Sequence, residues 1–417
     1  MTVDSVLQLK CSCNQYPWGK KGSESLAAQL AAKTPGWDED DKRNKTDFKI
    51  DEEKFYSEMW LGTYPVLPSY VLSTGEDLQD VIDKNPDELI GKGVMNKFGH
   101  TKLPYLPKVL SISKALPLQL HPNKELSAKI HSKDSEKFTD PNHKPEIALA
   151  LTKFEAFCGF KPLDQISKLV HLEPLKQFLP AVQKPSFDDM TLKHFVNTVL
   201  KADEDTIAKV QEELKKLPKD SFGGDSYIPD LIPRLQSQYE KTDPGTIVAL
   251  ITMNYLVLDP GQSIYIPADG IHAYLSGDII ECMARSNNVL NVGFCPAADR
   301  DSADLFCSVL TFSPHSPDEA LLKQQSYPGS ASGKTNVFKP PLSEFNMLTT
   351  ELGAGEEETL KPVKGPGIMI VTKGVATMKA QGKDFELKEG AVFFIGQGVE
   401  TSYEAKEGLQ MFTAYVE

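Results

Sequence analysis

The chain has 417 residues, of which 40% are hydrophobic and 25% are charged, and its formal net charge is −13. This size predicts two or three domains with large buried cores. The acidic balance argues against nucleic acid and anionic membrane surfaces as partners. We also find no apolar stretch near the roughly 20 residues of a transmembrane helix, no secretory apolar region near Met1, and too few cysteines for a disulfide framework. We therefore expect a cytoplasmic protein with reduced thiols.

The texture of the sequence changes from β to helical and back. Helical periodicity is clearest between Asp203 and Leu217, where apolar residues recur on one face. Short β runs separated by glycines occupy the last part of the chain and are typical of an antiparallel barrel or jelly roll. The charged segment 37–53 lacks such a pattern, and we interpret it as an exposed loop. The whole pattern predicts a mainly β protein with a helical insertion: residues 1–155 and 251–312 form one β domain, residues 156–250 form the insertion, and residues 313–417 form a second β domain.

The first chemical signal is the pair Gln119 and His121 in a strand-like apolar run. Residues two apart on a strand point to the same face, so these side chains are expected to project together. His121 alone is weak evidence, because an isolated histidine is more often structural.

The second signal is the segment 138–146, which holds two prolines, a histidine, a lysine and two acids. Glu146 opens the apolar run Ile147–Leu151, so its side chain is expected at the mouth of a β-barrel. A buried carboxylate is costly unless it is paired or binds a metal. The alternative is a surface loop with a Glu–Lys pair.

The third signal is His272, which follows the strand-like run Ile264–Pro267 and a turn. Together, one glutamine oxygen, two imidazoles and one carboxylate suit zinc. Only one of these ligands is anionic, which favours Lewis-acid chemistry with an open position over structural clamping. The sequence therefore predicts a catalytic zinc site at Gln119, His121, Glu146 and His272.

These segments together resemble type I mannose-6-phosphate isomerases (phosphomannose isomerases), zinc enzymes of the cupin superfamily. The resemblance runs along nearly the whole chain and is most specific at residues 140–146. The other matching segments are Gln15–Gly19, Glu58–Thr63, Lys108–Ser111, Gln119–Lys124 and His272–Gly277, followed by Glu281, Met283 and Ala284.

The resemblance implies one zinc ion per chain, held by the four residues named above. It implies a cupin-like jelly-roll catalytic domain, an all-α insertion and a C-terminal cupin-like β domain. It also implies interconversion of mannose 6-phosphate and fructose 6-phosphate through an enediol, which supplies GDP-mannose for glycosylation and cell-wall polymers. The expected partner is a small sugar phosphate, and we expect a monomer.

Three residues are candidates for proton transfer, namely Lys144, His143 and Glu281. A positioned acid or base typically contributes about 10²–10⁴-fold to the rate. The sequence does not decide among the three. The alternative for Lys144 is a purely structural pair with Glu146 or Asp140.

Four further residues are candidates for substrate binding. Lys108 and Ser111 are candidate phosphate contacts, although Lys108 fits an ordinary strand-edge lysine equally well. Trp18 and Tyr274 are candidate walls of the pocket, although an isolated aromatic residue is usually part of the core.

The chain departs from the family pattern after Glu281. Asn287, Asn291 and Ala297 stand where the family usually has an acid, an arginine and a lysine. The family arginine is thought to assist catalysis or to hold charge near the substrate. A guanidinium on a neighbouring loop is long enough to reach the same place, and we predict that Arg300 replaces it. The alternative is that Arg300 pairs with an adjacent aspartate on the surface.

Two other functions remain open. A sugar-phosphate-binding protein that has lost activity is supported only by Asn287 and Asn291. A cupin oxygenase would usually show His-x-His with a nearby glutamate, whereas this chain has Gln119 two residues before His121. Residues 316–417 contain no histidine, so we expect no second metal there and a structural role for that domain.

Overall fold

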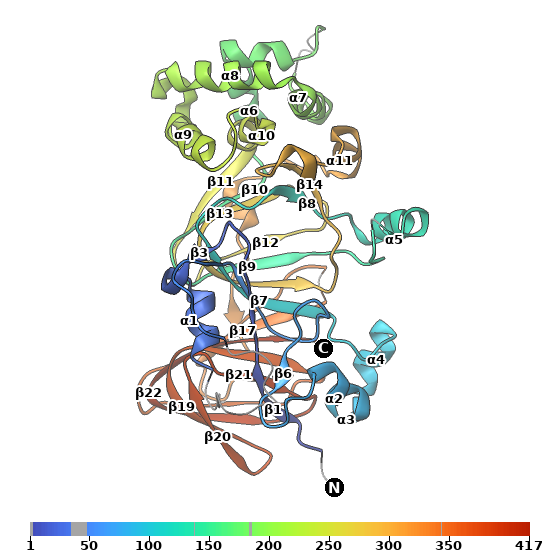
Figure 1. The fold of residues 1–417 in the computed structure, drawn as a ribbon, viewed down its shortest axis with the longest axis vertical. Coiled ribbons are helices and arrows are strands. Elements are labelled where there is room, and N and C mark those ends of the chain that lie inside the picture. The colour runs from blue at the N-terminus through green and yellow to red at the C-terminus, as the bar shows by residue number, and fades with distance from the viewer. Residues whose placement is uncertain (1–2, 35–47, 137, 183–185, 343) are drawn as a thin grey trace.

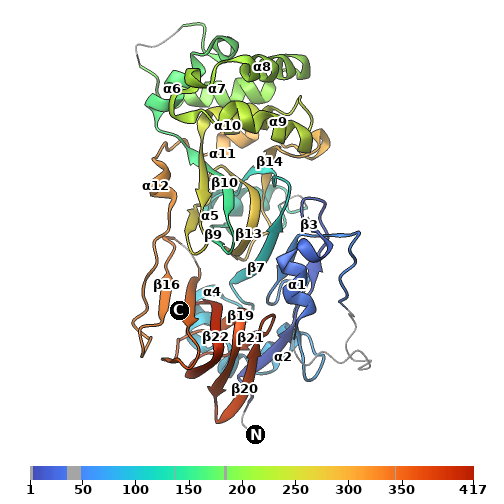
Figure 2. The same ribbon diagram turned by 90° about the vertical axis from the view of Figure 1, so that its left-hand side faces the viewer.

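The computed structural model describes residues 3–34, 48–136, 138–182, 186–342 and 344–417. The molecule is elongated and has three layers along its long axis (Figure 1). Helices form one end, an antiparallel β region lies in the middle, and a second antiparallel β region forms the other end; Figure 2 shows the same order after a quarter turn. The fold is mainly β with a substantial helical part, as the sequence predicts. The predicted loop at 37–53 lies largely outside the described residues.

The middle layer contains ten strands, which come from both sides of the helical segment in the sequence. The strands of this β region therefore come from two separate parts of the sequence. The strands are β2 (Cys13–Asn14), β5 (Glu58–Trp60), β7 (Tyr105–Ile112), β8 (Leu118–Leu120), β9 (Glu146–Ala150), β10 (Phe154–Phe160), β11 (Met253–Leu258), β12 (Ser263–Ile266), β13 (His272–Ala284) and β14 (Leu290–Gly293).

Strand β13 is the centre of this layer because it changes partners along its length. Its first residues pair with β10 and β8, and its later residues pair with β7 and β9. The change occurs at Gly277, which has φ 118°, and a Cβ there would lie 2.5 Å from the carbonyl oxygen of Lys153. Only glycine tolerates both the conformation and the close approach. One strand can therefore carry His272 and Glu281 into the same interior.

The helical layer packs on one end of the middle layer. Helix α8 begins at Glu204 because the side chain of Asp203 accepts a hydrogen bond from the backbone nitrogen of Thr206. Its buried residues include Ile207 and Val210, which confirms the predicted apolar face. The helices are α6 (Leu163–Val170), α7 (Asp189–Lys201), α8 (Glu204–Lys216), α9 (Ile228–Gln238), α10 (Pro244–Thr252) and α11 (Ala303–Val309), with 3-10 turns η2 (Glu173–Phe178) and η3 (Lys219–Asp225).

The boundaries of the helical part differ slightly from the prediction. Strand β10 continues to Phe160, and α10 continues to Thr252, where it leads directly into β11. Helix α10 is buried along its whole length, so it forms the base on which the other helices lie. Helix α11 comes from the returning β segment and packs against α7.

The second β region includes two strands from the N-terminal part of the chain, which the prediction had assigned to the first β domain. Strand β1 pairs with both β21 and β6, and so extends the C-terminal sheet. The strands of this region are β15 (Gln325–Ser326), β16 (Thr335–Phe338), β17 (Asn346–Leu352), β18 (Glu357–Leu360), β19 (Gly367–Ala380), β20 (Lys383–Lys388), β21 (Val392–Ile395) and β22 (Thr401–Tyr415), with β1 (Val6–Lys10) and β6 (Tyr70–Val71).

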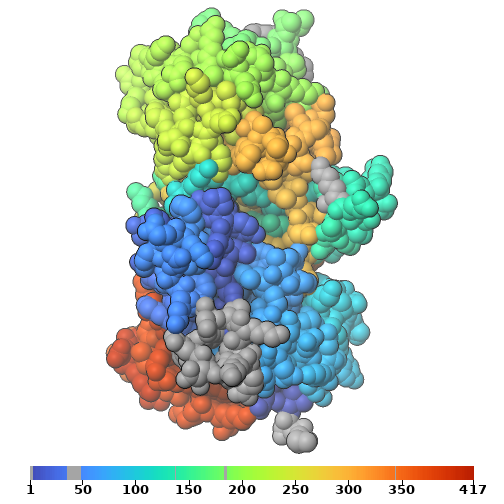
Figure 3. All heavy atoms as spheres, viewed as in Figure 1, coloured from blue at the N-terminus to red at the C-terminus, as the bar shows by residue number. Residues whose placement is uncertain are grey.

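Apolar side chains join the two β regions. Val109, Ile280 and Cys282 of the middle layer share a buried cluster with Ile370 and Phe412 of the C-terminal sheet. Short helices cover the edges, and Figure 3 shows α5 extending from the middle of the molecule. The short elements are α1 (Leu26–Ala32), α2 (Leu78–Lys84), α3 (Pro86–Leu89), α4 (Lys92–Phe98), α5 (Lys124–Lys133), α12 (Pro317–Ala320), η1 (Gly22–Glu24) and η4 (Ala297–Asp299), with a small sheet of β3 (Lys20–Lys21) and β4 (Phe55–Tyr56). Within the described ranges, every helix is too short or too polar to span a bilayer.

Candidate metal centre and active site

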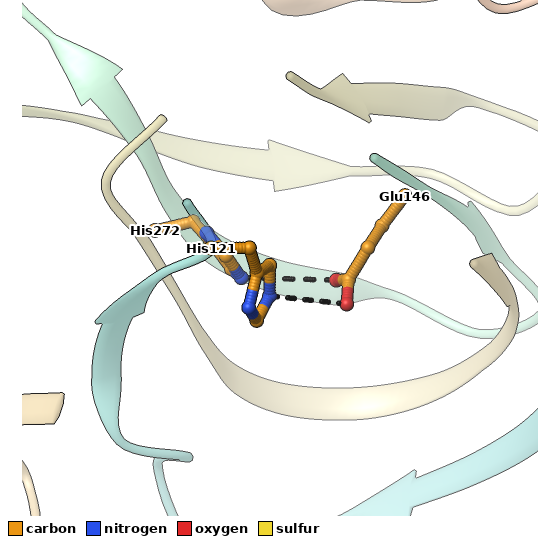
Figure 4. A group of neighbouring side chains, drawn as sticks. All are labelled: His121, Glu146 and His272. Carbon is orange, nitrogen blue, oxygen red and sulfur yellow. Dashed lines mark ion pairs between the residues drawn. The ribbon is translucent and has the colours of Figure 1, made fainter. Parts of the chain in front are cut away.

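Three buried side chains converge in the middle layer. Glu146 begins β9, His272 begins β13, and His121 directly follows β8. The Nε2 of His121 lies 3.2 Å from Oε1 of Glu146, and the Nε2 of His272 lies 3.7 Å from Oε2 (Figure 4). All three groups offer ligand atoms within 4.8 Å of one another. Three of the four predicted metal ligands therefore form one cluster.

Both imidazoles are oriented by a hydrogen bond on their other nitrogen. The Nδ1 of His121 lies 2.8 Å from the carbonyl oxygen of Asn288, and the Nδ1 of His272 lies 3.0 Å from that of Gly270. A carbonyl only accepts, so each Nδ1 carries the proton and each Nε2 presents its lone pair to the cluster. Among the described residues, neither Nε2 has a well-formed hydrogen bond. A metal ion that binds at Nε2 requires this tautomer, in which the proton is on Nδ1.

The charge state of the rings also suits a metal. Burial lowers the pKa of His121 to about 4, and burial also lowers the pKa of His272 below its ordinary value. Both rings are therefore neutral at pH 7. Divalent metals bind neutral imidazole, so neither histidine would have to lose a proton when a metal binds.

Gln119 lies on β8 directly opposite His272 in the β8–β13 register. Residues opposite each other in an antiparallel pair project to the same side of the sheet. Gln119 therefore faces the same side as His272, as the strand argument requires. Asn291 lies opposite Gln119 on its other neighbour, β14. The position where the family has an arginine is thus beside the predicted ligands, and the role of Gln119 as fourth ligand stays a prediction.

Glu146 is surrounded by groups that favour its ionised form. The Nζ of Lys144 lies 3.0 Å from its Oε1, and the hydroxyl of Tyr274 donates to its Oε2 at 3.2 Å. Although burial opposes ionisation, the ammonium of Lys144 holds the pKa of Glu146 well below its ordinary value. The carboxylate is therefore available as an anionic ligand. Lys144 and Tyr274, both predicted site residues, lie within contact of it.

A second charged group lies on the inner face of β7 and β13. Glu281 and Lys108 are opposite each other in the register, and the Nζ of Lys108 lies 2.9 Å from Oε2 of Glu281. Glu58 lies 4.0 Å from the same nitrogen. Burial raises the pKa of Glu281 to about 7, whereas Glu281 and Glu58 raise that of Lys108 in spite of burial. Two carboxylates and a buried ammonium thus line the same interior face as Glu146, which pairs with Met283 on β13.

Trp18 and His143 lie around this interior. Trp18 packs against the buried cluster that contains Tyr274, and its ring stacks on that of Tyr16 with centroids 5.9 Å apart. The Nε2 of His143 lies 3.3 Å from Glu344, a residue of the C-terminal region. The packing of Trp18 is consistent with the predicted wall, whereas His143 is held by a carboxylate rather than by a metal ligand.

Ser111 does not share the face of Lys108. It lies opposite Asp278 on the other side of the β7–β13 pair, is fully buried, and accepts a hydrogen bond from the backbone nitrogen of Ala27 at 3.0 Å. Residues three apart on a strand point to opposite faces. The geometry therefore gives Ser111 a structural role and does not support the predicted phosphate contact.

Arg300 forms its contacts with Asp243 and Cys295, and not with the residues of the His–Glu–His cluster. Its Nη2 lies 3.1 Å from Oδ2 of the buried Asp243 and donates to the carbonyl oxygen of Cys295 at 3.2 Å. The side chain of Asp243 caps α10 and accepts hydrogen bonds from the backbone nitrogens of Gly245 and Phe294. This arrangement differs from both sequence interpretations, because the partner is neither the metal site nor an adjacent surface aspartate. It gives no support to the predicted replacement of the family arginine.

Glu58 and Trp60 are site residues to which sequence reasoning assigned no role. The indole nitrogen of Trp60 donates to Glu58, and the Nζ of Lys108 lies 5.1 Å from the Trp60 ring. The sequence did contain a signal for Glu58, since it is an acid within a short apolar strand. Its position beside Lys108 could not be predicted, because the pairing of β5 with β7 depends on the tertiary fold. Glu344 gave no local signal, because its contacts come from segments about 200 residues earlier in the chain.

A mainly β fold with a buried His–Glu–His cluster beside a charged inner face is typical of enzymes that bind a metal ion. Comparison with known proteins gives the family. Residues 6–163 match the family model described as phosphomannose isomerase type I, catalytic domain, and residues 365–417 match the AraC-like ligand binding domain. The mannose-6-phosphate isomerase of Saccharomyces cerevisiae is 37% identical over 99% of this chain and 98% of its own length. That of Candida glabrata is 36% identical over 100% and 99%.

The chain therefore belongs to the mannose-6-phosphate isomerase family and is an isomerase, as the sequence resemblance implies. Solved structures share its fold. A zinc-bound mannose 6-phosphate isomerase is 24% identical, with a TM-score of 0.79 over 99% of this chain and 100% of the other. The metal-free enzyme of Salmonella typhimurium is 23% identical, with a TM-score of 0.80 over the whole of both chains.

Proposed function

We propose that this chain interconverts mannose 6-phosphate and fructose 6-phosphate with one zinc ion held by Gln119, His121, Glu146 and His272. The observation that carries this proposal is the buried carboxylate of Glu146, which faces the Nε2 atoms of two neutral imidazoles. The full-length similarity to mannose-6-phosphate isomerases and the zinc in a protein of the same fold support it. When bound, the zinc ion would stabilise negative charge on the two oxygens of the sugar between which the carbonyl moves.

The remaining chemistry is a proton transfer between adjacent carbons through an enediol. A base removes the proton from C2 of the aldose and returns it to C1, while the hydroxyl proton moves to the other oxygen. We assign the transfer of the carbon-bound proton to Glu281, because its carboxylate lies on the inner face of the β7–β13 pair. Its pKa of about 7 suits a base at neutral pH. Lys108 holds it in place at 2.9 Å.

Lys144 is the cationic group nearest to the predicted ligand Glu146. Its ammonium is suited to hold the sugar oxygens and to supply a proton to them, because a lysine offers three donors on a flexible stem. Trp18 and Tyr274 form the apolar side of the pocket in this proposal, since both belong to the packed interior beside Glu146.

The proposal extends to architecture and biology. We infer that both β regions are cupin-like jelly rolls, because each is built from antiparallel strands and β13 changes partners along its length, from β10 and β8 to β7 and β9. The mannose 6-phosphate formed in the reverse direction would enter GDP-mannose synthesis and hence glycosylation and cell-wall polymers. A cytoplasmic location and a monomeric state stay predictions from the sequence.

The test combines metal analysis with a coupled assay of fructose 6-phosphate formation. We expect about one zinc ion per chain, turnover of mannose 6-phosphate, loss of turnover after chelation, and recovery on addition of zinc. A zinc-loaded protein that binds the sugar phosphate without turning it over would contradict the proposal and favour the inactive binding protein. Redox-active iron with oxygen uptake would favour the oxygenase.

A further inference from the structure

Glu344 connects the C-terminal β region to the loop that carries the metal centre. It lies just before β17, and its side chain is only 9% exposed. Its Oε1 lies 3.2 Å from the Nζ of Lys124 and 3.3 Å from the Nε2 of His143, and its Oε2 accepts a hydrogen bond from Asn142 at 2.9 Å. A nearly buried carboxylate thus has three partners, all from the middle layer.

Two of these partners belong to the segment 140–146, which ends in the predicted ligand Glu146. Residues 139–145 are neither helix nor strand, and the segment contains Pro141 and Pro145, which cannot donate backbone hydrogen bonds. The backbone nitrogen of Ala284 donates to the carbonyl oxygen of Pro145 at 3.0 Å, so backbone pairing reaches the end of the segment. The contacts before Pro145 involve side chains, and the position of the loop depends on them. Glu344 supplies two of them from outside the catalytic layer.

The contacts continue from Glu344 to a metal ligand. The carbonyl oxygen of Asn142 accepts a hydrogen bond from the side chain of Asn288 at 3.0 Å. The carbonyl oxygen of Asn288 in turn accepts the Nδ1 proton of His121 at 2.8 Å. Outer partners of this kind fix the orientation of ligand imidazoles, and their loss typically costs about 10–100-fold in metal affinity or activity.

The same contacts lead to Lys144. It follows His143 directly, and its ammonium lies 3.0 Å from Glu146. When His143 is fixed by Glu344, the backbone that carries Lys144 is fixed as well. A shift of about 1 Å in such a group can cost about 10²-fold in rate.

We propose that Glu344 is a positioning residue, by which the C-terminal β region sets the place of Lys144 and Glu146 and the orientation of His121. The proposal rests on the proposed function of the metal site, and it gives the C-terminal region a role in catalysis beyond structural support. Glu344 contacts the loop, and in this proposal it acts through Asn142 and His143.

The competing explanation is that Glu344 only joins the two β regions. The chain offers a matched control in Glu358, a buried carboxylate of the same region that accepts hydrogen bonds from the backbone nitrogens of Ala331, Ser332 and Lys334. Its contacts all lie within the C-terminal region. Glu358→Gln therefore reports loss of a buried structural carboxylate without a link to the metal loop.

The experiment compares Glu344→Gln with Glu358→Gln in the full-length, zinc-loaded chain. We expect Glu344→Gln to lower kcat about 10-fold or more and to release zinc to a chelator about 10-fold faster. Glu358→Gln should lower the melting temperature but leave kcat and zinc release unchanged. Asn142→Ala, which removes the same contact from the other side, should reproduce the effect and serves if Glu344→Gln does not fold.

The outcomes separate this inference from the proposed function. If the unmodified zinc-loaded chain has no isomerase activity, the proposed function fails, and zinc release alone then decides the role of Glu344. If both kcat and zinc release of Glu344→Gln and Asn142→Ala stay within twofold of the unmodified chain, the positioning role is overturned. A fall in kcat or a rise in zinc release shared equally by Glu358→Gln would also overturn it.

Discussion

The Nζ of Lys144 lies 3.0 Å from Oε1 of Glu146, the same oxygen that lies 3.2 Å from Nε2 of His121. An ammonium and an imidazole lone pair thus converge on one carboxylate oxygen. A divalent ion held by these residues would repel the ammonium of Lys144. The pair would therefore couple metal binding to the position of Lys144.

The first prediction concerns this pair. Lys144→Met should retain zinc, or bind it more tightly, because a positive charge beside the metal is removed. Turnover should fall by about 10² or more, the usual contribution of a positioned acid or base. Steady-state kinetics and a competitive zinc chelator measure the two effects. Lys168→Met, at a lysine whose side chain is 79% exposed, is the control, and normal kcat in Lys144→Met would rule out a catalytic role.

The second prediction concerns the unequal ligands. Gln119→Ala should weaken zinc binding less than His121→Ala, because a neutral amide oxygen is a weaker zinc ligand than an imidazole oriented by Asn288. We expect a loss of about 10–100-fold in zinc affinity for Gln119→Ala and a larger loss for His121→Ala. Zinc titration at fixed pH measures both. Equal affinity of Gln119→Ala and the unmodified chain would remove Gln119 from the ligand set.

Much of this site could be predicted because the signals were local. Gln119 and His121 lie two apart, and the strand period alone predicts that they share a face. Glu146 could be predicted as a candidate ligand because it opens a buried strand after a turn-rich segment. Helix α8 was predicted because its cap and apolar face lie within one short stretch.

The missed features all depend on pairing between distant segments. The geometry does not support Ser111 as a phosphate contact, because Ser111 lies three residues from Lys108, on the opposite face of β7. Strand β1 could not be assigned to the C-terminal sheet because its partner β21 lies nearly 400 residues later in the sequence. The partner of Arg300 is likewise Asp243, whose local Asp-Pro pattern indicates a helix N-cap but not a distant ion pair.

The third prediction concerns pH and the junction of β10 with the helical layer. Glu155 lies 2.7 Å from Arg234 of α9 and accepts hydrogen bonds from Ser276 and Tyr255. Although burial opposes ionisation of this carboxyl, these partners lower the pKa of Glu155 to about 2 from an ordinary value of 4.5. The folded state therefore binds fewer protons than the unfolded state between these values. The stabilisation is present above pH 4.5 and is lost as the pH falls toward 2.

Glu155→Gln should remove this stabilisation at pH 7, by an amount on the order of 2–3 kcal/mol. The difference from the unmodified chain should shrink between pH 4.5 and 2. Urea unfolding at a series of pH values measures it, with the exposed Glu357→Gln as control. A difference that does not change with pH would show that the charge of Glu155 is not responsible.

The fourth prediction concerns Arg300, whose guanidinium lies 3.1 Å from the carboxylate of Asp243. Arg300→Ala leaves that buried carboxylate without its cation, and breaking a buried pair from one side typically costs about 3–5 kcal/mol. Burial already raises the pKa of Asp243 above its ordinary value, so an uncompensated charge there is unfavourable. We expect a lower melting temperature, full zinc content and near-normal kcat.

The double variant Arg300→Met with Asp243→Asn distinguishes the structural role from the catalytic one. It removes both charges and should recover part of the lost stability, because no unpaired ion remains buried. Asn291, opposite Gln119 in the β8–β14 register, then occupies the arginine position of the family without a substitute from this loop. If Arg300→Ala instead lowers kcat more than tenfold in zinc-loaded, folded protein, and the double variant does not restore it, Arg300 does serve the reaction.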